Sequence, residues 1–143
     1  MKYISSRGKE TGLSFEEVLF SGYAKDGGLY FPETIPKIDL ETLKTWKNLS
    51  YPEIVRNVMQ LYIGEDEIPT EDLKRLLKNA FSKFKSADKP IPISSLADGL
   101  NIAELHHGPT LAFKDLALGV VGQLYDYFLG NLMVRHVSYI HRR

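Results

Sequence analysis

The feature that most constrains the fold is a change of sequence pattern near residue 88. Between residues 39 and 84, apolar side chains recur every three or four positions, which is the spacing of amphipathic helices. Pro90 and Pro92 then end this pattern, because proline lacks a backbone N–H and breaks helices. We therefore predict that one domain ends at residue 88 and that another begins at residue 89.

Three helices are predicted in the second half of the first domain. Asp39 can cap a short helix, and Ser50 with Glu53 has the spacing of a capping box. The clearest helix begins at Thr70, and its apolar face carries Leu73, Leu76, Leu77, Ala80, Phe81 and Phe84. Each of these helices has an apolar face to bury and few side chains that could take part in catalysis or binding. We therefore interpret them as scaffold.

Residues 1–34 are predicted to be irregular and partly β, with one helix. Ser14 and Glu17 form a further capping box, and Gly22 is placed to end the helix that follows. The run Asp-Gly-Gly at 26–28 predicts a turn that leads into a short strand. The turn explains why Gly27 and Gly28 are glycines.

After the boundary the pattern predicts a strand hairpin, a polar loop and a helix. A short strand is expected around Ile93, a turn at 98–99 and a second strand at 100–105. The loop follows at 106–110, and a helix is expected to begin near Asp115. A strand, a polar loop and then a helix is the order in which open α/β sheets present ligand sites. The fold class is therefore expected to be α/β.

Composition narrows the classes of function. Eighteen basic residues balance eighteen acidic ones, so no net field favours nucleic acid or an acidic membrane. Cysteine is absent, which excludes disulfides and thiolate metal sites. No apolar run approaches the roughly 20 residues needed to span a bilayer, and none resembles a signal peptide. A cytoplasmic protein that binds neither nucleic acid nor membrane is expected, and the oligomeric state stays open.

Lys114 is the strongest candidate for a catalytic or cofactor-binding side chain. Its neighbours Leu111 and Phe113 are apolar, and it falls near the predicted start of a helix. Burial and the positive end of a helix dipole would both favour a neutral amine, which an imine-forming lysine needs. The alternative is an ordinary solvated lysine beside Asp115, and spacing alone leaves that alternative open.

The other polar candidates have simpler interpretations. His106 and His107 could orient a phosphate or fill a polar pocket, and we favour a structural role for both. Without cysteine or a third placed ligand they form a poor metal site, so no metal is expected. Asp115 is expected to cap the following helix. Arg7 has the geometry to contact a phosphate, although nothing in the sequence places it near Lys114.

Three segments resemble one known family. The run 104–116, ELHHGPTLAFKDL, resembles the cofactor-lysine motif of threonine synthases and threonine-synthase-like proteins. Residues 2–8, KYISSRG, and 26–33, DGGLYFPE, are similar to the family's amino-terminal patterns. The segments occur in the family's order and span roughly residues 1–130. The helical middle resembles the animal threonine-synthase-like proteins most.

This resemblance implies a two-domain α/β fold related to the β subunit of tryptophan synthase. Residues 1–88 would be the helical amino-terminal domain, and 89–130 the first strands and helix of the domain that binds pyridoxal 5'-phosphate. Lys114 would be both the catalytic and the cofactor-binding residue. The implied substrate is O-phosphohomoserine, converted either by a synthase to threonine or by a phospho-lyase to a keto acid, and the sequence does not choose between them.

The last segment, residues 131–143, departs from the family's pattern. A strand is expected to start within 133–140, and the Gly/Ser/Thr-rich loop that would bind the cofactor phosphate does not occur in the sequence. We therefore predict a truncated fragment with weak or no catalysis of its own. The alternative is a non-catalytic truncated isoform that acts in interaction or signalling.

Overall fold

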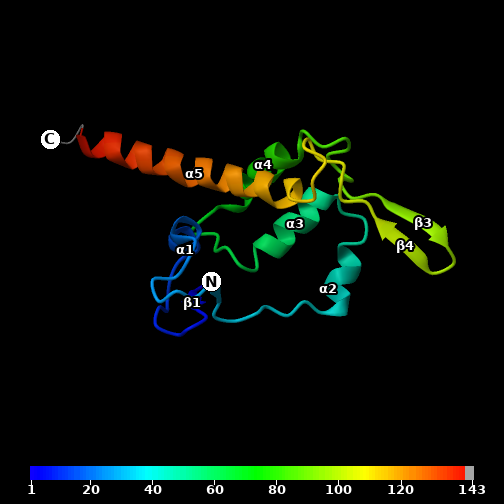
Figure 1. The fold of residues 1–143 in the computed structure, drawn as a ribbon. Helices are drawn as coiled ribbons and strands as arrows, with labels where there is room; N and C mark the ends of the chain where they lie inside the picture. The colour runs from blue at the N-terminus through cyan, green and yellow to red at the C-terminus, as the bar shows by residue number, and fades with distance from the viewer. Residues whose placement is uncertain (141–143) are drawn as a thin grey trace. The chain divides into compact units, whose positions relative to one another are not determined.

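The computed structural model describes residues 1–140, with side chains described as far as residue 131. It is a mixed α/β chain (Figure 1). Its elements in chain order are β1 (Tyr3–Ser5), α1 (Phe15–Ser21), β2 (Tyr30–Pro32), α2 (Leu40–Thr45), α3 (Tyr51–Met59), α4 (Thr70–Phe81), β3 (Ile93–Ala97), β4 (Leu100–Ala103) and α5 (Asp115–Ile140). Within residues 1–140, no helix is long enough and apolar enough to cross a bilayer.

The chain divides into two compact units. Unit 1 comprises Met1–Leu49 and Glu53–Leu73, and unit 2 comprises Ser50–Pro52 and the chain from Lys74 onward. The division falls within α4. The domain ranges 1–88, 89–130 and 131–143 describe family architecture and stay predictions.

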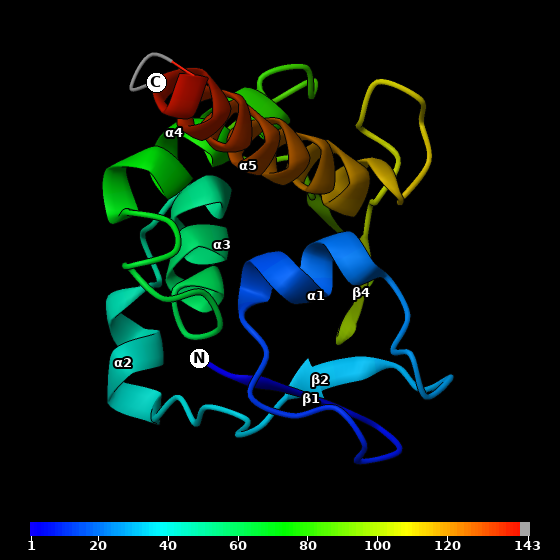
Figure 2. The ribbon, with the colours of Figure 1, turned by 90° about the vertical axis from the view of Figure 1, so that its left-hand side faces the viewer.

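Unit 1 begins with an antiparallel β ribbon and the capped helix α1, which lies beside it in Figures 1 and 2. The Ser14 side chain accepts a hydrogen bond from the Glu17 N–H, and the Glu17 carboxylate accepts one from the Ser14 N–H at 2.8 Å. The helix ends at Gly22, where φ is 67°. The predicted capping box and terminator are therefore confirmed.

The core of unit 1 is built around the first strand. Tyr3 is buried, and its hydroxyl donates to the Tyr62 carbonyl at 2.8 Å. Burial raises the pKa of Tyr3 to about 12, so the phenol stays protonated and keeps this hydrogen bond. The remaining buried apolar residues of unit 1 are Ala24, Ile63, Ile68 and Leu73.

The turn at 26–28 is held by side chains from the first strand and the residues after it. Buried Ser5 donates to an Asp26 carboxylate oxygen at 2.6 Å, and the other oxygen accepts from the Gly28 N–H. Gly27 has a φ of 78°, and a Cβ added at Gly28 would lie 2.7 Å from the Ser6 hydroxyl oxygen. The turn therefore requires both glycines, as the sequence indicated.

Unit 2 buries apolar residues of both α4 and α5, and the two helices lie side by side in both ribbon views (Figures 1 and 2). They approach closely at Gly119, where an added Cβ would lie 3.3 Å from the Ala80 carbonyl oxygen. The Tyr51 ring packs edge-on against Phe81 with centroids 5.2 Å apart. The buried apolar residues of unit 2 include Leu76, Leu77, Phe81, Phe84, Val120, Leu124 and Phe128.

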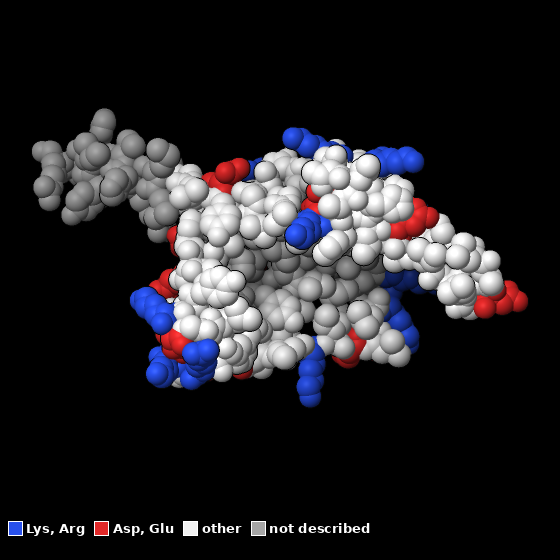
Figure 3. Space-filling model, viewed as in Figure 1, with Lys and Arg blue, Asp and Glu red and all other residues white. Residues whose placement is uncertain are grey.

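The β3–β4 hairpin leads directly into the loop that precedes α5. The strands are antiparallel, with Ser94 opposite Ile102, and the register shifts between Ser95 and Ala97. The turn uses Gly99, whose φ is 76°. The hairpin is largely uncharged on the face seen in Figure 3. It exposes the large apolar side chains of Ile93, Leu96, Leu100 and Ile102.

One element differs from expectation. The strand predicted to start within 133–140 is wrong, because α5 continues without a break to Ile140. A short apolar run with β-branched residues is compatible with either a strand or a buried helix. Here no proline interrupts the helix once it has begun at Asp115, so the backbone remains helical.

Candidate functional site

The loop between β4 and α5 is closed by Thr110 and Asp115. One Asp115 carboxylate oxygen accepts the Thr110 N–H at 2.8 Å, and the other accepts the Thr110 hydroxyl at 2.6 Å. Two tight turns shape this loop: the Leu111 N–H donates to the Gly108 carbonyl at 3.1 Å, and the Asp115 N–H donates to the Ala112 carbonyl at 3.0 Å. The loop thus has a defined backbone path into the helix.

Two backbone positions make this path specific. A Cβ added at Gly108 would lie 2.4 Å from an Asp115 carboxylate oxygen and 2.5 Å from the Asp115 Cβ, so only glycine fits. Leu111 has a φ of 61°, which is unfavourable for a bulky side chain. Such strained positions occur at functional sites more often than elsewhere, because the surrounding contacts must hold them.

Lys114 lies at the start of α5, as the sequence predicted. Its carbonyl accepts the Leu118 N–H at 2.8 Å, the first full turn of the helix. The predicted burial is wrong: Lys114 is exposed, and Leu111 and Phe113 are 71% and 63% exposed. The buried residues of α5 begin further along the helix, with Val120, Leu124 and Phe128. The assignment of Lys114 as the cofactor lysine stays a prediction.

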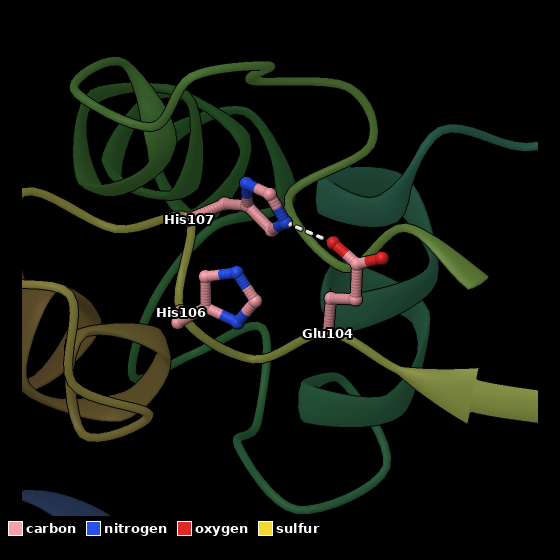
Figure 4. Close-up of side chains that lie close together, drawn as sticks. All are labelled: Glu104, His106 and His107. Carbon is pink, nitrogen blue, oxygen red and sulfur yellow. Dashed lines mark hydrogen bonds and ion pairs between the residues drawn. The ribbon is translucent and has the colours of Figure 1, made fainter. Parts of the chain in front are cut away.

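A second polar group lies at the start of the same loop (Figure 4). The Nε2 atom of His107 lies 2.6 Å from a carboxylate oxygen of Glu104, and the Ser94 hydroxyl donates to the other oxygen. The hydrogen bond from Ser94, followed by that with His107, lowers the pKa of Glu104 and keeps it ionised. The His106 ring stacks on His107 with centroids 4.4 Å apart.

The structure revises three expectations for the polar residues. Glu104 supplies the third potential metal ligand that the sequence argument did not identify. Asp115 binds Thr110 in the preceding loop, and it is the first residue of α5 rather than its cap. Arg7 donates to the Asp26 carbonyl at 3.1 Å, so its guanidinium supports the turn of unit 1. Glu104 could have been found from its spacing to His107 only by knowing that the strand ends before Glu104, at Ala103.

Comparison with known proteins places this chain in a family. A family model described as threonine synthase N terminus matches residues 2–81. The threonine synthase-like 2 protein of Xenopus laevis is 51% identical over 90% of this chain and 27% of its own length. The human threonine synthase-like 2 protein is 46% identical over 98% of this chain and 28% of its own length.

Solved structures agree with this placement. The crystal structure of threonine synthase from yeast superposes with a TM-score of 0.84 and 44% identity, over 92% of this chain and 27% of that one. The PLP-bound threonine synthase from Brucella melitensis gives a TM-score of 0.87 and 37% identity, over 92% of this chain and 28% of that one. The chain therefore spans about a quarter of the length of these relatives. Matched over more than half its length, the chain belongs to the threonine synthase N-terminus family.

Proposed function

We propose that this chain is the amino-terminal part of a pyridoxal-phosphate-dependent enzyme in which Lys114 holds the cofactor covalently. The observation that carries the proposal is an exposed lysine directly before α5, in a loop held by the Thr110–Asp115 ring. Support also comes from the family to which the chain belongs and from its likeness to a PLP-bound threonine synthase.

The residues of the loop fit covalent attachment. The Lys114 amine is accessible to solvent and therefore to an aldehyde, while the hydrogen bonds around it limit the backbone positions that its stem can take. A fixed stem lowers the entropy that is lost when the amine is positioned. Pyridoxal phosphate, when bound, supplies an electron sink for reaction beside the amino group of the substrate. Lys114 would hold the cofactor and move protons on the substrate.

We further propose that the whole enzyme acts on O-phosphohomoserine. A synthase of this kind releases phosphate and adds water at the β-carbon to give threonine. A phospho-lyase releases phosphate, and hydrolysis of the eliminated product by water then gives a keto acid and ammonia. The relatives include proteins named threonine synthase and threonine synthase-like 2, which supports an amino-acid substrate of this class.

Covalent trapping tests the role of Lys114. The purified chain is incubated with limiting pyridoxal phosphate, reduced with borohydride and digested, and the modified peptide is identified by mass spectrometry. We expect the label on the peptide that contains Lys114, and we expect it to be lost in Lys114→Ala. Lys89→Ala removes another exposed lysine of unit 2 and is the matched control, which should label like the unchanged chain. Labelling spread evenly over the lysines, or retained in Lys114→Ala, would contradict the assignment.

A chimera tests the proposed activity. In it, this segment replaces the matching segment of the yeast threonine synthase, which is 44% identical. We expect phosphate release from O-phosphohomoserine, with Lys114→Ala reducing the rate below detection and Lys89→Ala leaving it unchanged. A folded chimera whose Lys114→Ala variant stays active would exclude Lys114 from catalysis.

A further inference from the structure

Three potential metal ligands lie close together in the residues that directly follow β4. Glu104, His106 and His107 each offer one ligand atom, and these atoms all lie within 4.8 Å of one another. We propose that the three side chains bind a divalent transition-metal ion such as Zn²⁺, Co²⁺ or Ni²⁺. The proposal concerns neither Lys114 nor the cofactor, so it stands or falls independently of the proposed function.

The spacing is close to what a metal requires. In a tetrahedral zinc site with bonds of about 2.0–2.1 Å, the ligand atoms lie roughly 3.3 Å apart. A pair of ligand atoms at the 4.8 Å limit would therefore need to approach each other by about 1.5 Å. His106 is exposed, so its side chain can rotate toward an incoming ion without repacking a core.

The two less exposed ligands are already oriented. The Ser94 hydroxyl binds one carboxylate oxygen of Glu104, and the other oxygen faces His107 (Figure 4). The backbone on both sides is also held: the Glu104 N–H donates to the Pro92 carbonyl at 2.9 Å, and the Lys85 N–H donates to the His107 carbonyl at 3.2 Å. Hydrogen bonds of this kind to a ligating carboxylate are typical of metal sites, where they fix its orientation.

The ligand set indicates the class of metal. Two imidazoles and one carboxylate suit zinc, cobalt, nickel or copper, whereas calcium and magnesium prefer sites made of oxygen atoms alone. The ion would take the position between His107 Nε2 and the Glu104 carboxylate, and a neutral His107 that binds it through Nε2 would carry its N–H hydrogen on Nδ1. Three protein ligands leave one tetrahedral position for water.

The alternative is a hydrogen-bonded cluster that joins the hairpin to the loop without metal. Both interpretations explain the contact between Glu104 and His107. They differ over His106, whose ring merely stacks in the cluster but must contribute a nitrogen to a metal site. The decisive variant is therefore His106→Gln, which changes an exposed side chain and leaves the Ser94–Glu104–His107 hydrogen bonds in place.

Calorimetric titration with Zn²⁺ tests the proposal on the untagged 143-residue chain. His136 and His141 are first replaced by glutamine, so that every remaining histidine belongs to the proposed site. We expect one ion per chain, and a Co²⁺ absorption spectrum of four-coordinate intensity. His106→Gln and Glu104→Gln should each weaken binding by more than Ser94→Ala does, because each removes a metal ligand; loss of an outer-shell partner alone costs about 10- to 100-fold. Asp98→Asn, an exposed acid in the hairpin turn, should bind like the parent chain.

Further variants separate positioning from ligation. Ser94→Ala should lower the affinity about tenfold with the stoichiometry unchanged, because it removes only the group that orients Glu104. Lys114→Ala should bind zinc with unchanged affinity, which separates this site from the cofactor lysine. Circular dichroism of each variant confirms that it is folded. The absence of saturable binding, or equal affinity in the parent and in folded His106→Gln, would overturn the proposal.

Discussion

At the scale of single residues, the loop before α5 depends on a few contacts that could not be predicted from the sequence. The sequence indicates a loop at Gly108 because glycine and proline follow two histidines there. It does not indicate that the carboxylate of Asp115 folds back onto Thr110, because that contact depends on the path of the backbone between them. Close packing of Gly108 against Asp115 follows from the same path.

Gly108→Ala is predicted to destabilise the chain. The added Cβ would lie 2.5 Å from the Asp115 Cβ, so the loop must open and the Thr110–Asp115 hydrogen bonds weaken. Steric overpacking of this kind costs about 1–3 kcal/mol of unfolding free energy. Urea denaturation followed by circular dichroism measures the change.

Gly122→Ala is the matched control for this substitution. Gly122 lies in α5, and nothing lies within 4 Å of an added Cβ. Alanine is the better helix former, so the control should be about 0.5–1 kcal/mol more stable than the parent chain. If both alanine variants change stability equally, the close contact at Gly108 is not formed in solution.

At the scale of the element, short helices are specified by their ends. Helix α1 has seven residues, none of them buried, so its apolar face contributes little burial and its cap matters more. Helix α2 is likewise capped by Asp39, whose side chain accepts the Thr42 N–H at 2.8 Å. Both caps could be predicted because capping is local: donor and acceptor are three residues apart.

Ser14→Ala is predicted to lower the free energy of unfolding by about 1 kcal/mol, the typical cost of removing a serine cap. The variant loses the acceptor for the Glu17 N–H, which becomes an unsatisfied donor at the first turn. Thermal or urea unfolding measures the change, and Ser14→Asp, which restores an acceptor, should recover most of the stability. If Ser14→Asp does not restore the stability, the loss in Ser14→Ala is not caused by removal of the cap.

The same cap predicts a dependence on pH. The hydrogen bond from the Ser14 backbone N–H, and then that from its hydroxyl, lowers the pKa of Glu17 below its ordinary value of 4.5. A carboxyl whose folded pKa is depressed adds stability above its unfolded pKa, and this stability is lost as the pH falls through the folded pKa. The stability difference between the parent chain and Glu17→Gln should therefore be greatest near neutral pH and shrink below about pH 4.5. A difference independent of pH would contradict this account.

At the scale of the whole molecule, each of the two units has its own buried core. Unit 1 is built around Tyr3, Ile63 and Ile68, whereas unit 2 buries apolar residues of α4 and α5, which approach each other at Ala80 and Gly119. Apolar periodicity predicted which faces are buried, because a helix with a polar and an apolar side can bury only one of them. It could not predict which helix would cover α4.

Leu77→Ala is predicted to lower the free energy of unfolding by about 2–5 kcal/mol. The Leu77 side chain is 0% exposed, so its truncation leaves a cavity in the core. Leu118→Ala removes the same atoms from a side chain that is 61% exposed and should change stability by less than about 0.5 kcal/mol. Equilibrium unfolding in urea measures both. Equal effects would show that Leu77 is not buried in solution.

The sequence by itself determined the local features of this protein. The helix caps, the strand-loop-helix order and the family motif all depend on residues a few positions apart. The hydrogen bonds of a helix cap join residues that are neighbours in the chain, so the sequence alone is enough to predict them. Family resemblance likewise rests on the order of residues, which needs no coordinates.

Only the tertiary structure decided which groups meet. It exposed Leu111 and Phe113 beside Lys114, and it brought the Ser94 hydroxyl of β3 to the carboxylate of Glu104, ten residues further along the chain. It also continued α5 to Ile140, where apolar pattern alone allows strand or helix. These outcomes depend on how separate segments pack against one another, and packing is settled by shape and burial across the fold rather than by neighbours in the chain.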